Sequence, residues 1–212
     1  MSSGIRSKPW GHASRSLKQQ EVLRNSIIKA AKLLFVENGF GSVSIRNIAR
    51  EVNISPLIFN QVFENKRALL YHIWDDIFCE VAALISGIRE KQANPEDQLR
   101  GTIRTIDRYW IEHPDHFKVI FMYQDGPSQD SGSNYVDDMN SMHTISHLHQ
   151  ILEESGKADI FREHDSQAFA ESICIQILGV ALACVTIPEH SWTKNDTILG
   201  ILIDGILANL KT

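Results

Sequence analysis

The chain has 212 residues, of which 43% are hydrophobic and 22% charged, and its formal net charge is −5, which is ordinary for a soluble globular protein of one or two domains. Its first 20 residues are polar and basic without an apolar core, and its longest apolar run, 173–187, is shorter than the roughly 20 residues of a membrane span. We therefore expect neither a secretory signal nor a membrane contact, and we expect a cytoplasmic protein.

The first third of the chain predicts three helices. Apolar residues recur at three- and four-residue spacing over 17–38, which indicates a helix with one buried face, and Gly39 can adopt the left-handed conformation that ends it. Ser44 is the expected N-cap of a short second helix, and Asn53 and Ile54 form the turn after it.

A third helix follows that turn. Ser55 is its expected N-cap, Pro56 takes the first position, where a missing N–H costs nothing, and Phe63 closes it. Three helices with a tight turn between the second and third are typical of a helix-turn-helix unit, whose third helix lies in the DNA major groove. The alternative is a three-helix core used only for packing.

The distribution of charge favours DNA binding over that alternative. Residues 1–72 carry a net charge of +7, whereas residues 73–212 carry −12. DNA is attracted to the first segment and repelled by the second.

Longer helices make up the rest of the chain, so we predict an all-α fold. Asn65 caps a long fourth helix, and Pro95 and Pro114 each open another. The clearest loop is the stretch 125–134, which is rich in Gly, Ser and Asp. Further helices are expected over 135–154, 166–187 and 196–210.

These elements divide the chain into three parts. We predict a basic N-terminal arm (1–16), a helix-turn-helix DNA-binding domain (17–64), and a larger helical ligand-sensing and dimerisation domain (65–212). Basic arms can lie in the DNA minor groove or along phosphates, and a solvated tail that contributes little is the alternative.

The last two helices are apolar around much of their circumference. In the first of them the apolar residues cannot all face one side: Phe169, Ile173, Ile177, Val180 and Val185. A helix that is apolar on two sides needs two partners. We therefore predict a homodimer through a symmetric four-helix interface, with the last two helices of each chain. The alternative is a monomer with a buried central helix.

Aromatic, Met and His side chains are frequent between the two ends of the chain. They favour a pocket for a small, largely apolar ligand, with a few polar groups to orient it. The candidate ligand-binding residues are Trp74, Phe78, Trp110, Phe117, Phe121, Met139, Met142, His143 and His147. For each of them, ordinary core packing is the alternative.

Neither the histidines nor the cysteines predict a metal site. His143 and His147 are four residues apart, a spacing that can bind a metal, but no acidic or cysteine partner stands at the expected spacing. Cys79, Cys174 and Cys184 lie far apart in apolar helical stretches, so we expect buried, reduced thiols.

The segment 27–70, IIKAAKLLFVENGFGSVSIRNIAREVNISPLIFNQVFENKRALL, resembles the N-terminal domain of TetR-type transcriptional regulators. The features that match are Ala30-Ala31 followed by Leu34-Phe35, the triplet NGF at 38–40, Ile48-Ala49, Ile54-Ser55, Phe63, and Lys66 followed by Leu69. Their spacing is kept without a gap. The resemblance implies a homodimer, DNA recognition by the third helix, and a small-molecule pocket in the C-terminal domain.

The resemblance also implies individual DNA contacts. Ser44 and Lys66 are similar to phosphate contacts at helix N-termini, and Arg46 to a base or backbone contact from the second helix. The start of the third helix would face base edges through Ser55, Pro56, Leu57 and Ile58. The two aliphatic side chains can pack on a thymine methyl group but donate no hydrogen bond.

Three positions depart from the family's pattern. Leu57 stands where the family usually has Gly, Asn60 where it commonly has Tyr, and Val62 where it often has His or Tyr. Because that Tyr and His usually bind phosphates, some contact with the DNA backbone is lost. Asn60 can instead bind a phosphate or an adenine edge, and Gln61 offers similar chemistry. Val62 is expected to pack beside Phe63.

We therefore predict a TetR-type transcriptional regulator, namely a dimeric repressor that binds a near-palindromic operator and is released by a small, largely apolar ligand. The alternative is a DNA-binding regulator controlled by a protein partner, which a sensor domain without a cavity would favour. We predict no enzymatic activity and no cofactor, because no Ser-His-acid arrangement, glycine-rich phosphate loop or paired-carboxylate motif stands out.

Overall fold

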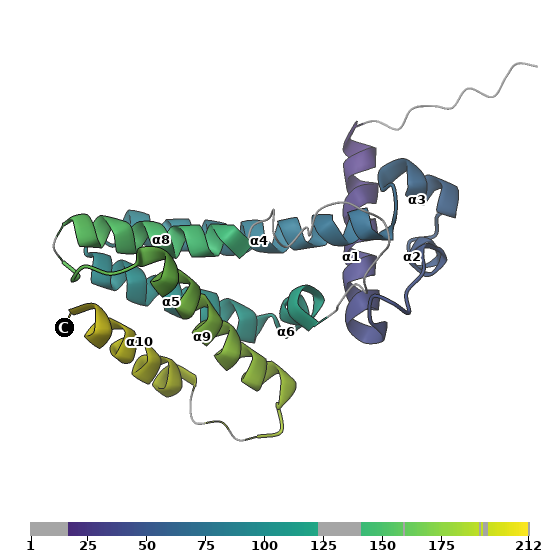
Figure 1. Cartoon of the computed structure of the whole chain (residues 1–212). Coiled ribbons are helices and arrows are strands. Elements are labelled where there is room, and N and C mark those ends of the chain that lie inside the picture. Colours follow the sequence, from purple (N-terminus) through teal and green to yellow (C-terminus); the bar gives the residue numbers. More distant parts are fainter. Residues whose placement is uncertain (1–16, 123–140, 159, 191, 193–194, 212) are drawn as a thin grey trace, which may run out of the picture.

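The computed structural model describes residues 17–122, 141–158, 160–190, 192 and 195–211, and these residues form an all-helical fold, as predicted. The head consists of α1 (Leu17–Asn38), α2 (Ile45–Glu51) and α3 (Pro56–Val62), and α4 (Lys66–Lys91) leads out of it. The body is formed by α5 (Pro95–Glu112), α6 (Pro114–Phe117), the π-helical turn η1 (Lys118–Met122), α8 (Ser141–Lys157), α9 (Ser166–Thr186) and α10 (Asn195–Lys211). Figure 1 shows the head and the body at opposite ends of the molecule, joined by α4.

Local signals in the sequence set the ends of the helices in the head. α1 ends where Gly39 adopts a left-handed φ of 76°. Ser44 caps α2 through a reciprocal capping box, because its hydroxyl accepts from the N–H of Asn47 while the Asn47 side chain accepts from the N–H of Ser44. Ser55 caps α3, and Pro56 occupies its first position. The predicted caps are thus confirmed.

The turn between α2 and α3 depends on Asn53. Its φ of 54° lies in the left-handed region, which costs most side chains roughly 1–2 kcal/mol but which asparagine tolerates. The N–H of Ile54 then donates to the carbonyl of Ala49 at 2.9 Å and closes the end of α2. As a result α3 packs against both α2 and α1.

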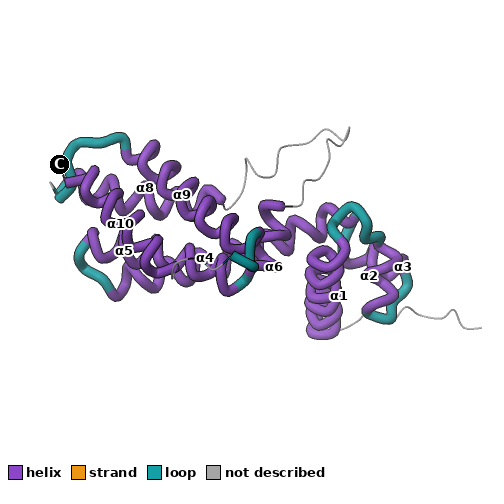
Figure 2. The backbone as a smooth tube through the Cα atoms, turned by 90° about the horizontal axis from the view of Figure 1, so that it is seen from below, coloured by secondary structure: helices purple, strands orange, loops and turns teal. Residues whose placement is uncertain are grey.

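One hydrophobic core runs from the head through α4 into the body. α4 contributes buried side chains from Leu69 to Ile85, and α1 contacts both α4 and η1. In the body, α5, α8 and α9 pack against one another, and α10 lies at the outer edge beside α5 and α9. Figure 2 shows α6 at the junction of head and body, so the head packs on the body rather than hanging from a linker.

Most predicted helix boundaries are confirmed, and one element was missed. α1 matches its predicted range, and α9 and α10 match theirs within one residue. Val62 packs against the core, as expected. The predicted arm, the loop 125–134 and the start of the helix predicted over 135–154 lie outside the described residues. The turn η1, where the helix after Pro114 widens, was not predicted.

Candidate nucleic-acid interface and ligand cavity

The exposed face of α3 carries most of the residues predicted to contact bases. The exposed residues are Ser55, Pro56, Leu57, Asn60 and Gln61. Phe59 is fully buried and holds α3 against the core, while Ile58 is half-buried. Leu57 is 70% exposed, so the surface of α3 combines one large apolar side chain with two amides.

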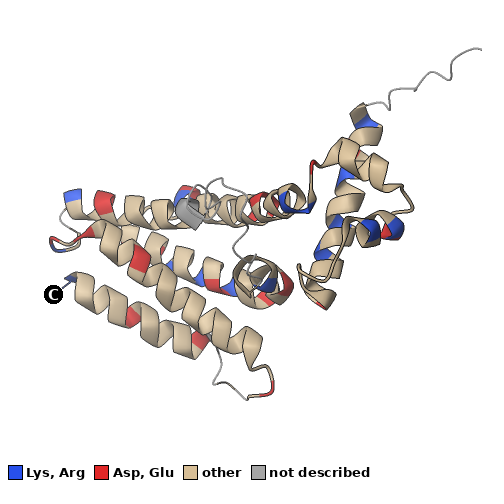
Figure 3. Ribbon diagram, turned by 45° about the vertical axis from the view of Figure 1, so that its right-hand side comes forward, with Lys and Arg blue, Asp and Glu red and all other residues tan. Residues whose placement is uncertain are grey.

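Positively charged side chains lie near this face. Arg46 and Arg50 are exposed on α2 and stand one turn apart, on the same side of the helix. Arg50 was missed, although its four-residue spacing from Arg46 marks the same face. Arg24 of α1 lies over the ring of Phe63, 5.6 Å from its centroid. Figure 3 shows lysines and arginines along α1 and on α2, which makes the head attractive to phosphates.

Ser44 and Lys66, which were predicted to contact phosphates at helix N-termini, have different surroundings in the structure. Ser44 is exposed at the start of α2 and holds the capping box. Lys66 instead turns inward: its Nζ donates to the carbonyls of Phe40 at 2.6 Å and Val43 at 2.8 Å, and it lies 4.0 Å from the centroid of the Phe40 ring. The Lys66 ammonium thus binds the backbone between α1 and α2. The phosphate contact predicted for it would compete with these hydrogen bonds and stays a prediction.

A small apolar cavity lies in the body between α4, α5, η1, α8 and α9, with a volume of about 70 Å³. Its lining residues are Phe78, Ile106, Trp110, Phe121, Thr144, Ile145, Cys174 and Leu178. Phe78, Trp110 and Phe121 were among the predicted ligand-binding residues. The cavity is thus built mainly from aromatic and aliphatic side chains, the lining that an apolar ligand prefers.

Two other predicted ligand-binding residues support the wall of this cavity instead of lining it. The ring of Phe117 lies 4.9 Å from that of Phe121 and 6.0 Å from that of Trp110, measured between centroids. Trp74 is buried on α4, and its Nε1 donates to the carbonyl of Val119 at 3.0 Å. This hydrogen bond ties α4 to η1, the turn that also carries Phe121.

The remaining predictions for the ligand site fall on α8 or before it. His147 is half-buried on α8 and does not line the cavity. Met142 and His143 belong to the first turn of α8 with side chains outside the described part, and Met139 lies outside it altogether. Within the described residues, no group of three or more His, Cys, Asp or Glu side chains is placed to hold a metal.

Five lining residues were missed by the sequence analysis: Ile106, Thr144, Ile145, Cys174 and Leu178. For Cys174 and Leu178 the available signal is the broad apolar surface of α9, which can face a cavity as well as a second copy. Burial raises the pKa of the Cys174 thiol to about 12, so this thiol stays protonated and behaves as a small apolar group. Cys79 corrects the expectation of buried thiols, because it is exposed on the outer side of α4.

A hydrogen-bonded cluster joins α4, α5 and α6 next to the head. The hydroxyl of Tyr109 donates to Glu80 Oε2 at 2.7 Å and lies 2.8 Å from His116 Nδ1. Because the hydroxyl has a single proton, His116 Nδ1 carries the proton shared with the tyrosine oxygen. Burial first, and then the charge of Lys32 in α1, lower the pKa of His116, which is therefore neutral at pH 7.

α9 and α10 each expose a large apolar side chain on their outward face. Ile175 of α9 is 69% exposed and Ile201 of α10 is 71% exposed. Gly179 and Gly205 stand one turn further along the same faces, and an added Cβ at either would meet nothing within 4 Å. An open groove of about 410 Å³ lies between the two helices. Packing among the described residues thus explains neither the exposed isoleucines nor the glycines.

α9 is also long and apolar enough to cross a membrane, with a mean hydropathy of 2.0 over its most apolar 18-residue window, of which 22% is buried. It is the one such helix in the described part of the chain. Its outward face includes the exposed Ser172 and Gln176 beside Gly179. Polar and small side chains on that face favour contact with protein over contact with lipid.

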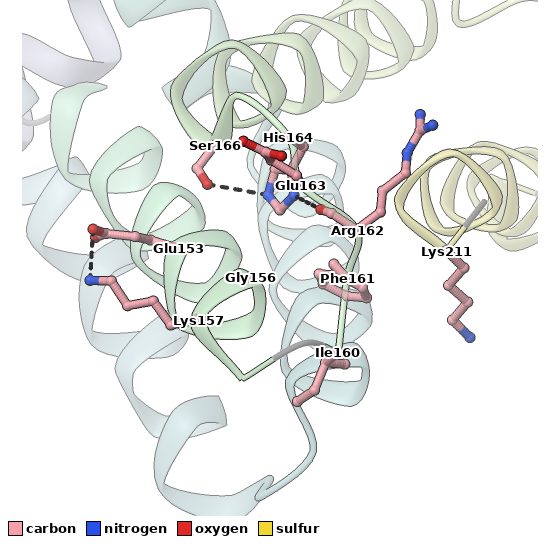
Figure 4. A pocket seen from close by; sticks show the side chains of 10 residues that line it. All are labelled: Glu153, Gly156, Lys157, Ile160, Phe161, Arg162, Glu163, His164, Ser166 and Lys211. Carbon is pink, nitrogen blue, oxygen red and sulfur yellow. Dashed lines mark hydrogen bonds and ion pairs between the residues drawn. The ribbon is translucent and has the colours of Figure 1, made fainter.

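A wide surface depression of about 630 Å³ lies at the end of the body farthest from the head, between α8, the α8–α9 connection and α10. Both of its lysines are in ion pairs: Lys157 binds Glu153 at 2.8 Å, and Lys211 binds Glu96 at 2.5 Å. Figure 4 shows His164 held between the Arg162 carbonyl and Ser166. The depression contains none of the predicted site residues.

Known proteins are similar to the head in sequence and to most of the chain in fold. The sequence profile of the family described as "Bacterial regulatory proteins, tetR family" matches residues 27–73. The "Uncharacterized HTH-type transcriptional regulator YuxN" of Bacillus subtilis (strain 168) is 23% identical over 193 residues, which cover 90% of this chain and 62% of that protein. The chain therefore spans less than two thirds of the length of this curated relative.

Solved structures extend the likeness to the body. A bacterial regulatory protein in the tetR family from Rhodococcus RHA1 has a TM-score of 0.69 at 20% identity, covering 89% of this chain and 96% of its own. The transcriptional regulator FadR from Bacillus subtilis, solved in complex with stearoyl-CoA, has a TM-score of 0.73 at 15% identity, covering 87% of this chain and 98% of its own. At these identities the structures show a common fold.

Proposed function

We propose that this chain, which belongs to the TetR family of transcriptional regulators, is a homodimeric repressor that binds a near-palindromic operator and is released by a small, largely apolar ligand. Its family and relatives are transcriptional regulators, a class without enzymatic activity. The proposal includes action in the cytoplasm, DNA binding by residues 17–64, and sensing and dimerisation by residues 65–212.

The observation that carries the proposal is the surface of the head. Within a helix-turn-helix unit, α3 is held by the buried Phe59 and leaves Leu57, Asn60 and Gln61 exposed, with Arg46 on the adjacent helix. Amides can bond adenine edges and phosphates, and arginine can bond guanine or phosphate. These groups support a role of α3 in the major groove.

The salt dependence of DNA binding tests this proposal. We expect the protein to bind random-sequence duplex DNA, and we expect the logarithm of its association constant to fall linearly with the logarithm of the salt concentration. Arg46→Gln should reduce the slope by about one for each head that contacts the duplex. Arg162→Gln, which removes an exposed arginine from the body, serves as the matched control and should leave the slope unchanged. Absence of binding even in dilute buffer would reject the proposal.

The exposed faces of α9 and α10 support the homodimer. A second copy related by a two-fold axis can place its own α9 and α10 against these faces, which would bury Ile175 and Ile201. Gly179 and Gly205 would allow the helices to approach closely. Dimerisation also serves recognition, because one seven-residue α3 contacts too few bases for useful specificity.

The cavity and its neighbours support release by a ligand. At about 70 Å³ the cavity is well below the 300 Å³ or more of typical ligand pockets, so a ligand must displace part of its wall. Phe121, 38% exposed, is the wall residue on η1, and the Trp74–Val119 hydrogen bond ties η1 to α4. A ligand that moves η1 would therefore act on the helix that leads into the head.

Control by a protein partner is the second candidate, and the small volume of the cavity favours it. The two are separated by adding straight-chain fatty acids and their CoA esters to the purified protein; FadR of Bacillus subtilis, of the same fold, was solved with stearoyl-CoA. A compound that raises the melting temperature and weakens DNA binding supports the small-molecule ligand. If neither these compounds nor a protein-free cell extract changes DNA affinity, the protein partner is supported.

A further inference from the structure

We propose that Leu57 determines DNA specificity by selecting a thymine, through its C5-methyl group, at one position of each half-site. The inference rests on the proposed function, since it concerns the same surface of the head. It goes beyond that function by naming the base and the residue that selects it.

The first turn of α3 presents one large side chain, Leu57, beside the small exposed residues Ser55 and Pro56. The Ser55 hydroxyl accepts the N–H of Ile58 at 3.3 Å, and Pro56 has no N–H to donate. Ile58 is half-buried and Phe59 fully buried. Leu57 is 70% exposed and takes no part in the hydrophobic core. The structure describes every residue of this turn, and Leu57 is the large side chain among them that is exposed to solvent.

The chemistry of the major groove matches this side chain to one base. Thymine alone presents a methyl group there, beside its O4 acceptor, whereas the other three bases present donors and acceptors without a methyl group. Leucine has no polar atom, so it leaves a donor or acceptor that it covers without a partner, which is unfavourable. Contact with the thymine methyl instead buries apolar surface on both sides. Leu57 therefore both favours thymine and disfavours its competitors.

The neighbours of Leu57 are suited to the adenine of an A·T pair. Asn60 and Gln61 follow Leu57 by three and four residues, so all three share one face of α3, and both amides are exposed. An amide side chain can bond N6 and N7 of adenine at once. The face of α3 thus combines a partner for the thymine methyl group with partners for adenine, and we infer an A·T-containing half-site.

Replacing thymine by uracil, which differs only by the missing methyl group, tests the inference directly. Duplexes that bind the full-length protein are first selected from a random pool, and each thymine of the selected site is then changed to uracil in turn. We expect one thymine in each half-site at which the change weakens binding roughly fourfold, the factor for one buried methyl group. In Leu57→Ala the same change should have no effect.

Leu84→Ala is the matched control, because Leu84 is a leucine on α4 that is 49% exposed, and it should retain the full effect of uracil. Circular dichroism and the melting temperature show whether Leu57→Ala is folded, as the exposure of Leu57 predicts. If the protein binds the selected duplex but no change of thymine to uracil weakens binding, or Leu57→Ala shows the same weakening, the inference is overturned. The proposed function stays intact in that case. A protein that binds no duplex at all would overturn both.

Discussion

At the scale of single residues, the cations of the head divide into those that hold it together and those that face outward. Lys66 and Arg46 lie in the same basic segment and were both predicted to contact DNA. The Nζ of Lys66 is bound to two carbonyls between α1 and α2, whereas Arg46 is exposed on α2. The sequence does not distinguish them, because the carbonyls that bind Lys66 lie more than 20 residues away along the chain.

Lys66→Met separates the two roles, since it keeps the length of the side chain and removes the ammonium. We expect the free energy of unfolding in urea to fall by about 1–3 kcal/mol, because the carbonyls of Phe40 and Val43 lose a charged donor. The salt slope of DNA binding should not change at a temperature where the variant is folded. Arg46→Met should do the opposite, with stability kept and the slope reduced. A reduced slope with full stability in Lys66→Met would return the lysine to the DNA interface.

At the scale of helices, the sequence predicts what is determined locally. The limits of α2 and α3 follow from Ser44, Ser55 and Pro56, whose effects act within one turn. The cavity is different, because its wall combines five elements and depends on how each helix is rotated about its axis. Periodicity shows that α9 is apolar on two sides, but not that Cys174 and Leu178 face the cavity while Ile175 faces outward.

The junction of α4, α5 and α6 gives the protein a pH dependence at this same scale. Burial and Lys32 hold the pKa of His116 below its ordinary value of 6.5, and they outweigh Asp115 and Glu80, which act in the opposite direction. As the pH falls, the unfolded chain therefore binds a proton before the folded one does. The contribution of the neutral His116 to stability is complete above about pH 6.5 and is lost as the pH decreases below it.

His116→Asn tests this contribution. Asparagine can donate to the Tyr109 oxygen as Nδ1–H does, but it does not titrate. We expect the unfolding free energy of the variant to fall less steeply than that of the natural chain between pH 6.5 and pH 5, as measured by urea denaturation. Parallel curves would show that another group carries the pH dependence.

At the scale of the whole molecule, its two ends have opposite charge and different tasks. The head belongs to the segment of charge +7, and the body to the segment of charge −12. A long acidic body repels DNA, so it orients the head toward the duplex and keeps α9 and α10 clear of it. That separation leaves the last two helices available for the proposed dimer, in which α3 of each copy would face DNA.

Ile201→Asp tests the joining of two copies. Ile201 is 71% exposed in the single chain, so the substitution should leave the fold and the helix content of the chain unchanged. In the dimer the new carboxylate would be buried close to Asp204, an acidic residue on the same helix whose side chain is 69% exposed in the single chain. Burial of an unpaired charge is costly, so we expect the dimer to dissociate. Light scattering should then give a mass of 24.0 kDa in place of twice that value, and affinity for a two-half-site operator should fall at least tenfold. Leu84→Asp, which places the same charge on the exposed side of α4, should remain dimeric. A dimeric Ile201→Asp would exclude this face of α10 from the interface.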